Sequence, residues 1–334
     1  MSSCSRATAV AHPNIALVKY WGKHDEDLVL PLADSLSMTL DVFPTTTTVR
    51  LTPHRDHDTL LLDGVPATDE VLHRVVAFLT LLRTRTGRTA PAVVETHNTV
   101  PVGAGLASSA AGFAALALAA ATAYGADLSA PGLSRLARRG SGSACRSVFG
   151  GFVWWHAAHP DDPDPDRASY AEPLPDVRLD LAMIVVMLHT GAKPTSSRDA
   201  MRRTVRTSPL FPDWIAATRE DVPAMRACLE DGDLERAGAI AERNALGMHA
   251  TMESATPPVV YRTAASHRLL DHVRALRDRG EQTWATMDAG PNVKVLCPAA
   301  EAPRIAAELA AVSGCPTVVA HPGPAAALTT TGRS

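Results

Sequence analysis

The sequence predicts a mixed α+β protein built in two halves, and three observations lead to this fold class. Segments with strand character and segments with helical character alternate, but without the regular rhythm of a doubly wound parallel sheet. The chain has 334 residues, which is enough for one large domain or two ordinary ones. An apolar run at residues 178–188, RLDLAMIVVML, indicates a buried strand that begins a second half. We therefore expect a first domain at residues 1–178, a second at 179–322 and a flexible tail at 323–334.

The elements of the first half follow from local patterns. Residues 45–52, TTTTVRLT, are rich in β-branched side chains and favour a strand, and the DTLLLDG segment favours a second strand that ends in a turn. Apolar residues at helical spacing predict a helix over about residues 69–85. A short strand is expected at 91–95 and a short helix near 129–139, followed by the strand-like FGGFVWWH.

No charged side chain stands between Glu95 and Asp127. About 20 apolar residues can span a membrane, so a span has to be considered. However, Pro101 and several glycines and serines interrupt this stretch, and alanine dominates the rest. We expect a loop that leads into a buried helix, and no contact with a membrane.

The second half repeats the mixture of helices and strands. Helices are expected around residues 222–229, 234–248, 261–279 and 303–312. Strands are expected before Asp288, at VKVLC and at PTVVA.

Composition excludes some classes of protein. The net charge of −3 does not favour a nucleic-acid binder. The five cysteines are scattered, with no CxxC pair, which favours reduced thiols in a cytosolic enzyme over a disulfide framework or a zinc site. Only four basic residues are lysines, and two of them, Lys19 and Lys23, fall within the short stretch KYWGK. Since lysine and arginine differ in how they meet phosphate, this grouping is a modest functional hint.

Two glycine- and serine-rich segments are candidate anion sites. Residues 101–112, PVGAGLASSAAG, combine glycines, hydroxyls and a helix start, which suits phosphate, although small residues that allow close helix packing would produce the same pattern. The segment is neither a Walker A loop nor a Rossmann fingerprint. Residues 138–146, RRGSGSACR, can bring hydroxyls and backbone amides together beside Arg146, unless they form a solvated basic turn.

Three further segments carry polar groups with alternative interpretations. If residues 14–23, NIALVKYWGK, form one strand, Lys19 and Lys23 share a face. The SSRDAM segment has hydroxyls beside an arginine, or is simply a helix cap with Ser197 and an acid in the first turn. In TMDAGPNVKV, Asp288 is either a turn residue or a carboxylate held alone at the end of a strand. Several anion sites together indicate a nucleotide donor and an anionic acceptor, with Mg²⁺ carried by phosphates.

These motifs resemble those of the GHMP kinase superfamily, whose phosphate loop has the form PxxxGLxSSA. Within it, the chain resembles most closely the diphosphomevalonate decarboxylase family. The resemblance rests on NIALVKYWGK, SLSMTL, GLASSAAG, RRGSGSACRS, SSRDAM, MHAT and MDAGPNVK, which occur in the family's order over most of the chain. The first and last motifs are highly specific, whereas the glycine loop marks only the superfamily.

The resemblance implies a two-lobed fold, with a ribosomal protein S5 domain 2-like first half, a ferredoxin-like second half and the active site in the cleft between them. It also implies that ATP phosphorylates the 3-hydroxyl of mevalonate 5-diphosphate. Loss of that phosphate and of CO₂ then yields isopentenyl diphosphate. ATP and Mg²⁺ are the implied cofactors, and a cytoplasmic homodimer is the implied assembly.

The same resemblance assigns roles to residues. Asp288, Lys19 and Arg146 match the reaction centre, where Arg146 also holds the substrate carboxylate. The substrate-binding positions, which surround the diphosphate, are Tyr20, Lys23, Ser141, Gly142, Ser143, Ser197 and Arg198. The positions that would hold the ATP phosphates are Gly103, Ala104, Gly105, Leu106, Ala107, Ser108 and Ser109. Asp34 departs from the family, which often has asparagine there, and we leave it out of the site.

Two other functions stay open at this level. The chain could be a kinase or decarboxylase that acts on mevalonate or phosphomevalonate, because the size of the acceptor is the weakest inference. From a different class, it could be a nucleotide-binding regulator without catalytic activity, which the joint presence of Lys19, Arg146 and Asp288 disfavours.

Overall fold

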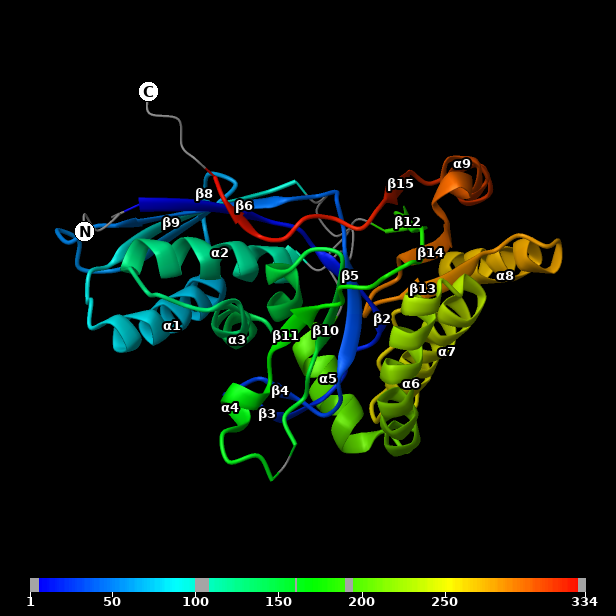
Figure 1. The fold of residues 1–334 in the computed structure, drawn as a ribbon, viewed down its shortest axis with the longest axis horizontal. Coiled ribbons are helices and arrows are strands. Elements are labelled where there is room, and N and C mark those ends of the chain that lie inside the picture. The colour runs from blue at the N-terminus through cyan, green and yellow to red at the C-terminus, as the bar shows by residue number, and fades with distance from the viewer. Residues whose placement is uncertain (1–5, 100–107, 160, 190–194, 330–334) are drawn as a thin grey trace.

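The computed structural model describes residues 6–99, 108–159, 161–189 and 195–329. Within these ranges, three main sheets and their covering helices form the mixed α+β protein that the sequence predicts. The first half lies on one side of the molecule and the second half on the other (Figure 1).

The largest sheet belongs to the first half and also includes the last strand of the chain. Adjacent strands in this sheet are antiparallel except for β7 and β9, which are parallel. The strands, in spatial order, are β16 (Ala327–Leu328), β1 (Arg6–Ala11), β6 (Thr45–Leu51), β9 (Ala92–Asn98), β7 (Thr59–Leu62) and β8 (Val65–Pro66).

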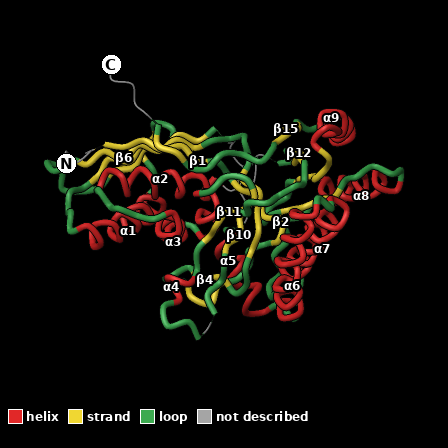
Figure 2. Tube along the Cα trace, in the orientation of Figure 1, coloured by secondary structure: helices red, strands yellow, loops and turns green. Residues whose placement is uncertain are grey.

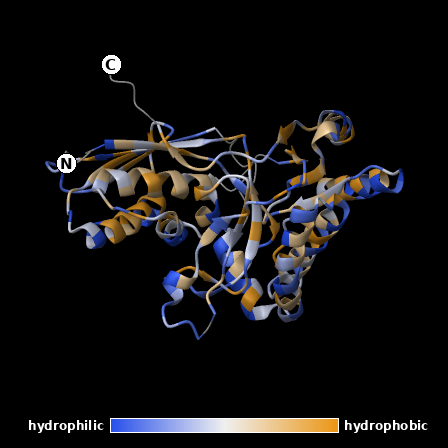
Figure 3. Ribbon diagram, viewed as in Figure 1, coloured by the Kyte–Doolittle hydropathy of each residue, from blue (hydrophilic) through white to orange (hydrophobic). Residues whose placement is uncertain are grey.

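Three helices cover one face of this sheet, as Figure 2 shows: α1 (Asp69–Thr86), α2 (Ser108–Tyr124) and α3 (Ala130–Gly140). Ala7, Ala9 and Ala11 of β1 point into the same core as the alanines of α2, so small side chains on both surfaces let the helix lie close to the sheet. Figure 3 shows no strongly hydrophilic residue on α2. The expected buried helix is confirmed, and among the described helices none is long and apolar enough to cross a membrane.

A second sheet lies at the centre of the molecule. Its order is β11 (Ala171–Pro173), β10 (Phe152–Trp155), β5 (Ser35–Thr39) and β2 (Asn14–Val18). The short helix η1 (Gly142–Val148) precedes β10, and α4 (Pro165–Ala168) precedes β11. Every residue of β2 and β5 is buried, because elements of both halves pack against this sheet.

Residues 14–23 do not form one strand, so the condition under which Lys19 and Lys23 would share a face is not met. Strand β2 ends at Val18, and Lys23 begins a separate two-stranded ribbon formed by β3 (Lys23–Asp25) and β4 (Leu30–Pro31). Between them, Gly22 adopts a φ of 115°, a conformation that interrupts a strand and favours glycine. The two lysines therefore point to different neighbours.

The third sheet forms the second half, in the order β13 (Trp284–Met287), β14 (Val293–Pro298), β12 (Leu181–Val186) and β15 (Thr317–Ala320). Helices α8 (Ala264–Asp278) and α9 (Ala302–Ser313) cover one face, and α6 (Phe211–Asp231) and α7 (Leu234–Glu253) cover the other. Helix α5 (Ser197–Thr207) and the single turn η2 (Ala299–Glu301) complete the half. Because both faces are covered, β12 is apolar at every position.

The two halves share one hydrophobic core. Leu17 and Leu36 of the central sheet belong to the same buried cluster as Val185 of β12 and Met225 of α6. The alternation of β12 explains this cluster: one set of its side chains meets α6 and α7, and the other set meets α8 and α9. The site residues described below therefore stand on a packed interface.

The expectation of a flexible tail from residue 323 is wrong for the part that the structure describes. Gly323 exchanges backbone hydrogen bonds with Thr39 and Gly151, and β16 pairs with β1. A Cβ atom at Gly323 would lie 2.1 Å from the carbonyl oxygen of Leu40. The segment is held by backbone pairing and by small residues that permit close approach, features without a hydrophobic pattern.

Substitution of Gly323 tests this packing. Gly323→Ala should destabilise the protein by about 1–3 kcal/mol, because the added methyl group must displace backbone. Thermal unfolding measures the effect. Gly112→Ala is the matched control, since a Cβ atom there meets nothing within 4 Å and alanine favours a helix. An unchanged melting temperature for Gly323→Ala would contradict the packing of this segment.

Candidate active site

Asp288 lies in the turn that connects β13 to β14, directly after the last residue of β13. Its backbone carbonyl accepts a hydrogen bond from Nε2 of His249 at 3.0 Å. On the far side of the turn, Ser266 Oγ donates to the carbonyl of Pro291 at 2.7 Å. The prediction that a strand ends here and leaves a single carboxylate in the turn is confirmed, and neighbouring elements hold the turn in place.

Two lysines bind the carboxylate of Asp288, one on each oxygen. Lys19 Nζ donates to Oδ1 at 2.9 Å, and Lys294 Nζ donates to Oδ2 at 3.0 Å. Lys19 also donates to the carbonyl of Ala16 at 2.7 Å. Each lysine side chain is 2% exposed and that of Asp288 is 25% exposed, so the carboxylate is reachable from solvent while its partners are buried.

The charges at this site shift one another's proton affinities. Burial alone would raise the pKa of Asp288, but Lys19 and Lys294 outweigh burial and hold that pKa well below its usual range. Burial lowers the pKa of Lys19 to about 8, even though Asp288 favours its charged form, and the nearby charges of Lys294 and Arg146 act in the same direction as burial. Asp288 is thus an ionised carboxylate and a weak base.

Arg146 is held rigidly beside this pair. It is buried, and its guanidinium donates to the hydroxyls of Ser37 at 2.9 Å and Ser35 at 2.7 Å, and to Asn14 Oδ1 at 3.1 Å. The Trp155 ring lies 5.7 Å below its guanidinium carbon. The motifs NIALVKYWGK and SLSMTL, which are distant from RRGSGSACRS in sequence, thus meet around this arginine, and its orientation is fixed by three neutral partners.

Tyr20 and the glycine–serine segment lie together. Gly142 is packed so closely against Tyr20 that a Cβ atom would come within 2.7 Å of the tyrosine oxygen. Ser141 precedes η1, Ser143 lies in its first turn, and the hydroxyls of Ser141 and Ser109 are 3.4 Å apart. The structure therefore joins the start of α2 to the glycine–serine segment, as two adjoining parts of one site would require.

Lys23 and α5 contribute further cations, of which Arg198 and Arg202 are exposed. Lys23 pairs with Glu26, and Arg202 lies 3.5 Å from the same carboxylate. Burial would raise the pKa of Glu26, but these two cations outweigh it and lower that pKa. Ser197 is the first residue of α5, and Ser196, not Ser197, caps the helix by accepting from the amide of Asp199. Arg198 is exposed, and it is close enough to Tyr20 for its positive charge to interact with the tyrosine side chain.

Part of the predicted ATP loop lies outside the described residues: Gly103, Ala104, Gly105, Leu106 and Ala107. Ser108 begins α2, so the loop leads into a helix N-terminus, where backbone amides favour phosphate. No group of three or more His, Cys, Asp or Glu side chains that could hold a metal occurs among the described residues. We expect a magnesium ion at this site to take most of its ligands from the phosphate oxygens of the bound nucleotide.

The structure also explains Asp34. Its carboxylate accepts hydrogen bonds from Nε1 of Trp154 and from the amide of Ala157, each at 2.7 Å. Both oxygens are thereby engaged on β10 and the segment that follows it. Asp34 is a structural residue, in agreement with its exclusion from the site.

Sequence reasoning missed two cations that the structure adds. Lys294 was part of a motif but received no role. Arg74 lies on α1, donates to the carbonyl of Gly140 at 3.3 Å and stacks on Phe113. Burial lowers the pKa of Arg74, and the nearby positive charge of Arg198 lowers it further. In sequence, Arg74 resembles any polar position of an amphipathic helix, so only the tertiary structure could reveal it.

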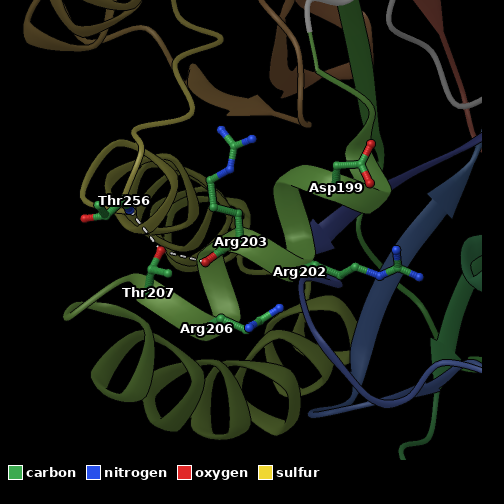
Figure 4. A pocket seen from close by; sticks show the side chains of 6 residues that line it. All are labelled: Asp199, Arg202, Arg203, Arg206, Thr207 and Thr256. Atoms are coloured by element: carbon green, nitrogen blue, oxygen red, sulfur yellow. Dashed lines mark hydrogen bonds between the residues drawn. The ribbon is translucent and has the colours of Figure 1, made fainter.

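A separate pocket of about 320 Å³ lies on the outer side of α5 (Figure 4). Its lining consists of Asp199, Arg202, Arg203, Arg206, Thr207 and Thr256. In Figure 4 the side chain of Arg203 extends in a different direction from those of Arg202 and Arg206. This pocket lacks the convergent donors found around Asp288.

Known proteins share this fold and about a third or more of this sequence. The diphosphomevalonate decarboxylases of Gibberella zeae and Homo sapiens are each 35% identical to this chain, over 86% of it and 79% and 76% of their own lengths. The solved mevalonate diphosphate decarboxylase of Enterococcus faecalis is 41% identical with a TM-score of 0.89, covering 98% of this chain and 99% of that one. The enzyme from Staphylococcus aureus is 37% identical with a TM-score of 0.91, covering 98% of each chain.

Two family descriptions match almost the whole chain. Residues 11–171 match the diphosphomevalonate decarboxylase-like N-terminal domain, and residues 182–321 match the mevalonate 5-diphosphate decarboxylase C-terminal domain. Together with the whole-length relatives, these matches identify the chain as a member of the diphosphomevalonate decarboxylase family, within the GHMP kinase superfamily.

Proposed function

We propose that this protein catalyses the ATP-dependent decarboxylation of mevalonate 5-diphosphate to isopentenyl diphosphate. The observation that carries the proposal is the partly exposed Asp288 carboxylate between two buried lysines, with Arg146 fixed nearby. Family membership supports the same reaction. A related structure that is 42% identical, with a TM-score of 0.91 over 98% of this chain and 99% of its own, is a complex with MVAPP, AMPPCP and magnesium.

The reaction has two stages. The 3-hydroxyl oxygen of the substrate first forms a bond to the terminal phosphorus of ATP, the bond from that phosphorus to ADP breaks, and the hydroxyl proton passes to a phosphate oxygen or to water. The bond from C3 to this oxygen then breaks, and its electron pair leaves with phosphate. The bond to the neighbouring carboxylate breaks in turn, and its electron pair forms the C=C bond as CO₂ departs. Magnesium, when bound, offsets negative charge on the phosphates.

Asp288 acts in this scheme by charge and orientation. A carboxylate whose pKa lies well below its usual range is a poor proton acceptor, so its strongest contribution is to orient the hydroxyl and to stabilise positive charge that develops at C3. Lys19 lies where it can offset negative charge on the phosphoryl group. Arg146, held by neutral partners, can orient the substrate carboxylate without binding it so tightly that CO₂ release is hindered.

The remaining predicted residues are proposed to hold the two phosphorylated ligands. For the substrate diphosphate, they are Tyr20, Lys23, Ser141, Gly142, Ser143, Ser197 and Arg198, and the position of Arg74 beside Gly140 supports adding it to this set. For the ATP phosphates, they are the residues from Gly103 to Ser109. The hydroxyls of Ser109 and Ser141 are 3.4 Å apart, which supports a proposal in which the two sets adjoin.

We also propose that the two domains meet near residue 178, between the two family matches, and that the protein is a cytoplasmic homodimer. Buried thiols at Cys145, Cys228 and Cys297, none of them in a disulfide, fit a reducing compartment. Light scattering during size-exclusion chromatography tests the dimer.

A direct assay tests the function. Purified protein is mixed with Mg²⁺-ATP and either mevalonate 5-diphosphate, its 5-monophosphate or mevalonate, and ADP and CO₂ are followed separately. Equal amounts of ADP and CO₂ from the diphosphate are expected. ADP without CO₂ would indicate a kinase, and a preference for the monophosphate or mevalonate would correct the substrate.

Asp288→Asn should lower kcat roughly 10²–10³-fold, because the variant loses the charge that faces C3. Its affinity for ATP should change little, since the nucleotide is proposed to bind at the start of α2. Steady-state kinetics and ATP titration measure the two quantities. A variant that keeps wild-type turnover would remove Asp288 from the reaction, and a non-catalytic regulator would show no turnover in either form.

Activity should fall as the pH rises above about 8. With its pKa lowered to about 8, Lys19 loses its proton well below the usual lysine range, and the site then loses one positive charge. A pH–rate profile from 6 to 10 measures this limb. Lys19→Arg is the control: arginine stays protonated, so this variant, although slower, should lack the limb near 8. A limb at the same pH in both proteins would assign it to another group.

A further inference from the structure

Lys294 is a buried lysine in the interior of a sheet. It lies on β14, opposite Thr286 of β13 and Val185 of β12, so strands flank it on both sides. Its side chain is 2% exposed, and its ammonium donates to Asp288 Oδ2 at 3.0 Å. Burying an ammonium group is costly unless it is paired, so a lysine here needs a reason beyond the packing of the strand.

The carboxylate of Asp288 cannot by itself balance the charges around it. Lys19 already forms one buried pair with it, so Lys294 is a second cation on the same group. In the part of the chain that the structure describes, Asp288 is the only carboxylate within ion-pairing distance of either lysine.

The other titratable groups near Asp288 do not restore the balance. Arg146 adds a third cation. His249 faces the backbone carbonyl of Asp288 and is neutral, because burial lowers its pKa to about 4. Behind His249, Glu253 and Arg262 pair with each other. The free site therefore carries an excess of positive charge.

We propose that Lys294 is a positioning residue for Asp288. It holds Oδ2 so that the carboxylate keeps its orientation and its ionised state when phosphoryl oxygens compete for Lys19. It also leaves the free site with a positive charge that anionic ligands neutralise. This inference rests on the proposed function, because it assigns Asp288 to the reaction.

The arrangement of the two lysines separates their tasks. Lys19 is tied to Ala16 as well as to Oδ1, and it follows directly on β2 of the first half. Lys294 belongs to the same hairpin as Asp288, six residues further on. A movement between the halves would change the distance from Lys19 to Asp288 but not the distance from Lys294. Lys294 is therefore the counterion that can stay with the carboxylate throughout turnover.

Lys294→Met should produce two effects of opposite sign. The free protein should become more thermostable, because a one-to-one pair of Lys19 with Asp288 remains and an excess buried charge is gone. At the same time kcat should fall at least about tenfold, with a smaller change in KM, because Oδ2 is no longer held. The acid limb of the kcat profile should move to higher pH, because loss of a cation raises the pKa of Asp288.

Two controls accompany this variant. Lys294→Arg keeps a cation on the hairpin and should retain the acid limb of the wild type, although its kcat will fall because guanidinium has a different shape. Arg268→Met removes one positive charge from the exposed surface of α8, and it should change neither kcat nor the pH profile.

The outcomes distinguish this inference from the proposed function. If the wild type releases CO₂ and Lys294→Met retains its kcat and pH profile, the positioning role is wrong. Failure of Lys294→Met to fold, or a lower melting temperature with an unchanged acid limb, would make Lys294 a structural residue and overturn the proposal. If the wild type releases no CO₂ from any of the three substrates, the proposed function itself fails.

Discussion

The ion pair between Lys19 and Asp288 joins the two halves of the molecule at the site. Lys19 comes from the first half and Asp288 from the second, yet their charged atoms are 2.9 Å apart. Such a pair forms only if both backbones are placed correctly, and the shared core of β2, β5, β12, α6 and α7 does this. Removing one partner of a buried pair typically costs about 3–5 kcal/mol, so the geometry of the site and the packing between the halves depend on each other.

Site residues differ in how firmly they are held, and the difference follows their proposed tasks. Asp288 and Arg146 are each fixed by several partners from other elements, as groups that must meet a reacting atom require. Arg198 is exposed, and Lys23 is paired with the exposed Glu26. Such cations can bind a diphosphate through charge-assisted hydrogen bonds.

The sequence predicted those features that depend on local pattern. The strand before Asp288 has a strong apolar signal followed by turn residues, and the alanine-rich stretch before Asp127 did form a buried helix. Helix α6 is predicted only near residues 222–229, but it begins at Phe211 and contains Pro223 in its interior. Packing against α7 and the central sheet compensates for what the proline removes.

Features that depend on distant partners could not be predicted. Arg74 reaches the candidate site only because the fold brings α1 to Gly140, 66 residues away in sequence. The return of residues 323–329 to β1 rests on backbone hydrogen bonds and close approach, which leave no hydrophobic pattern in the sequence. The boundary between the two domains is also hard to predict from sequence, because residues on both sides of it contribute to one hydrophobic core.

The acids around the site support the view that its positive charge is functional. Asp34, which directly precedes Ser35 in the sequence, has both oxygens occupied by Trp154 and Ala157. Glu26 is exposed and stands at the edge, where it covers Lys23 and Arg202. Neither acid reduces the excess charge around Asp288, and a second carboxylate there would repel incoming phosphates. In the free protein the positive charges around Asp288 therefore repel one another, and anionic ligands reduce this repulsion when they bind. The site consequently favours phosphorylated ligands over neutral ones.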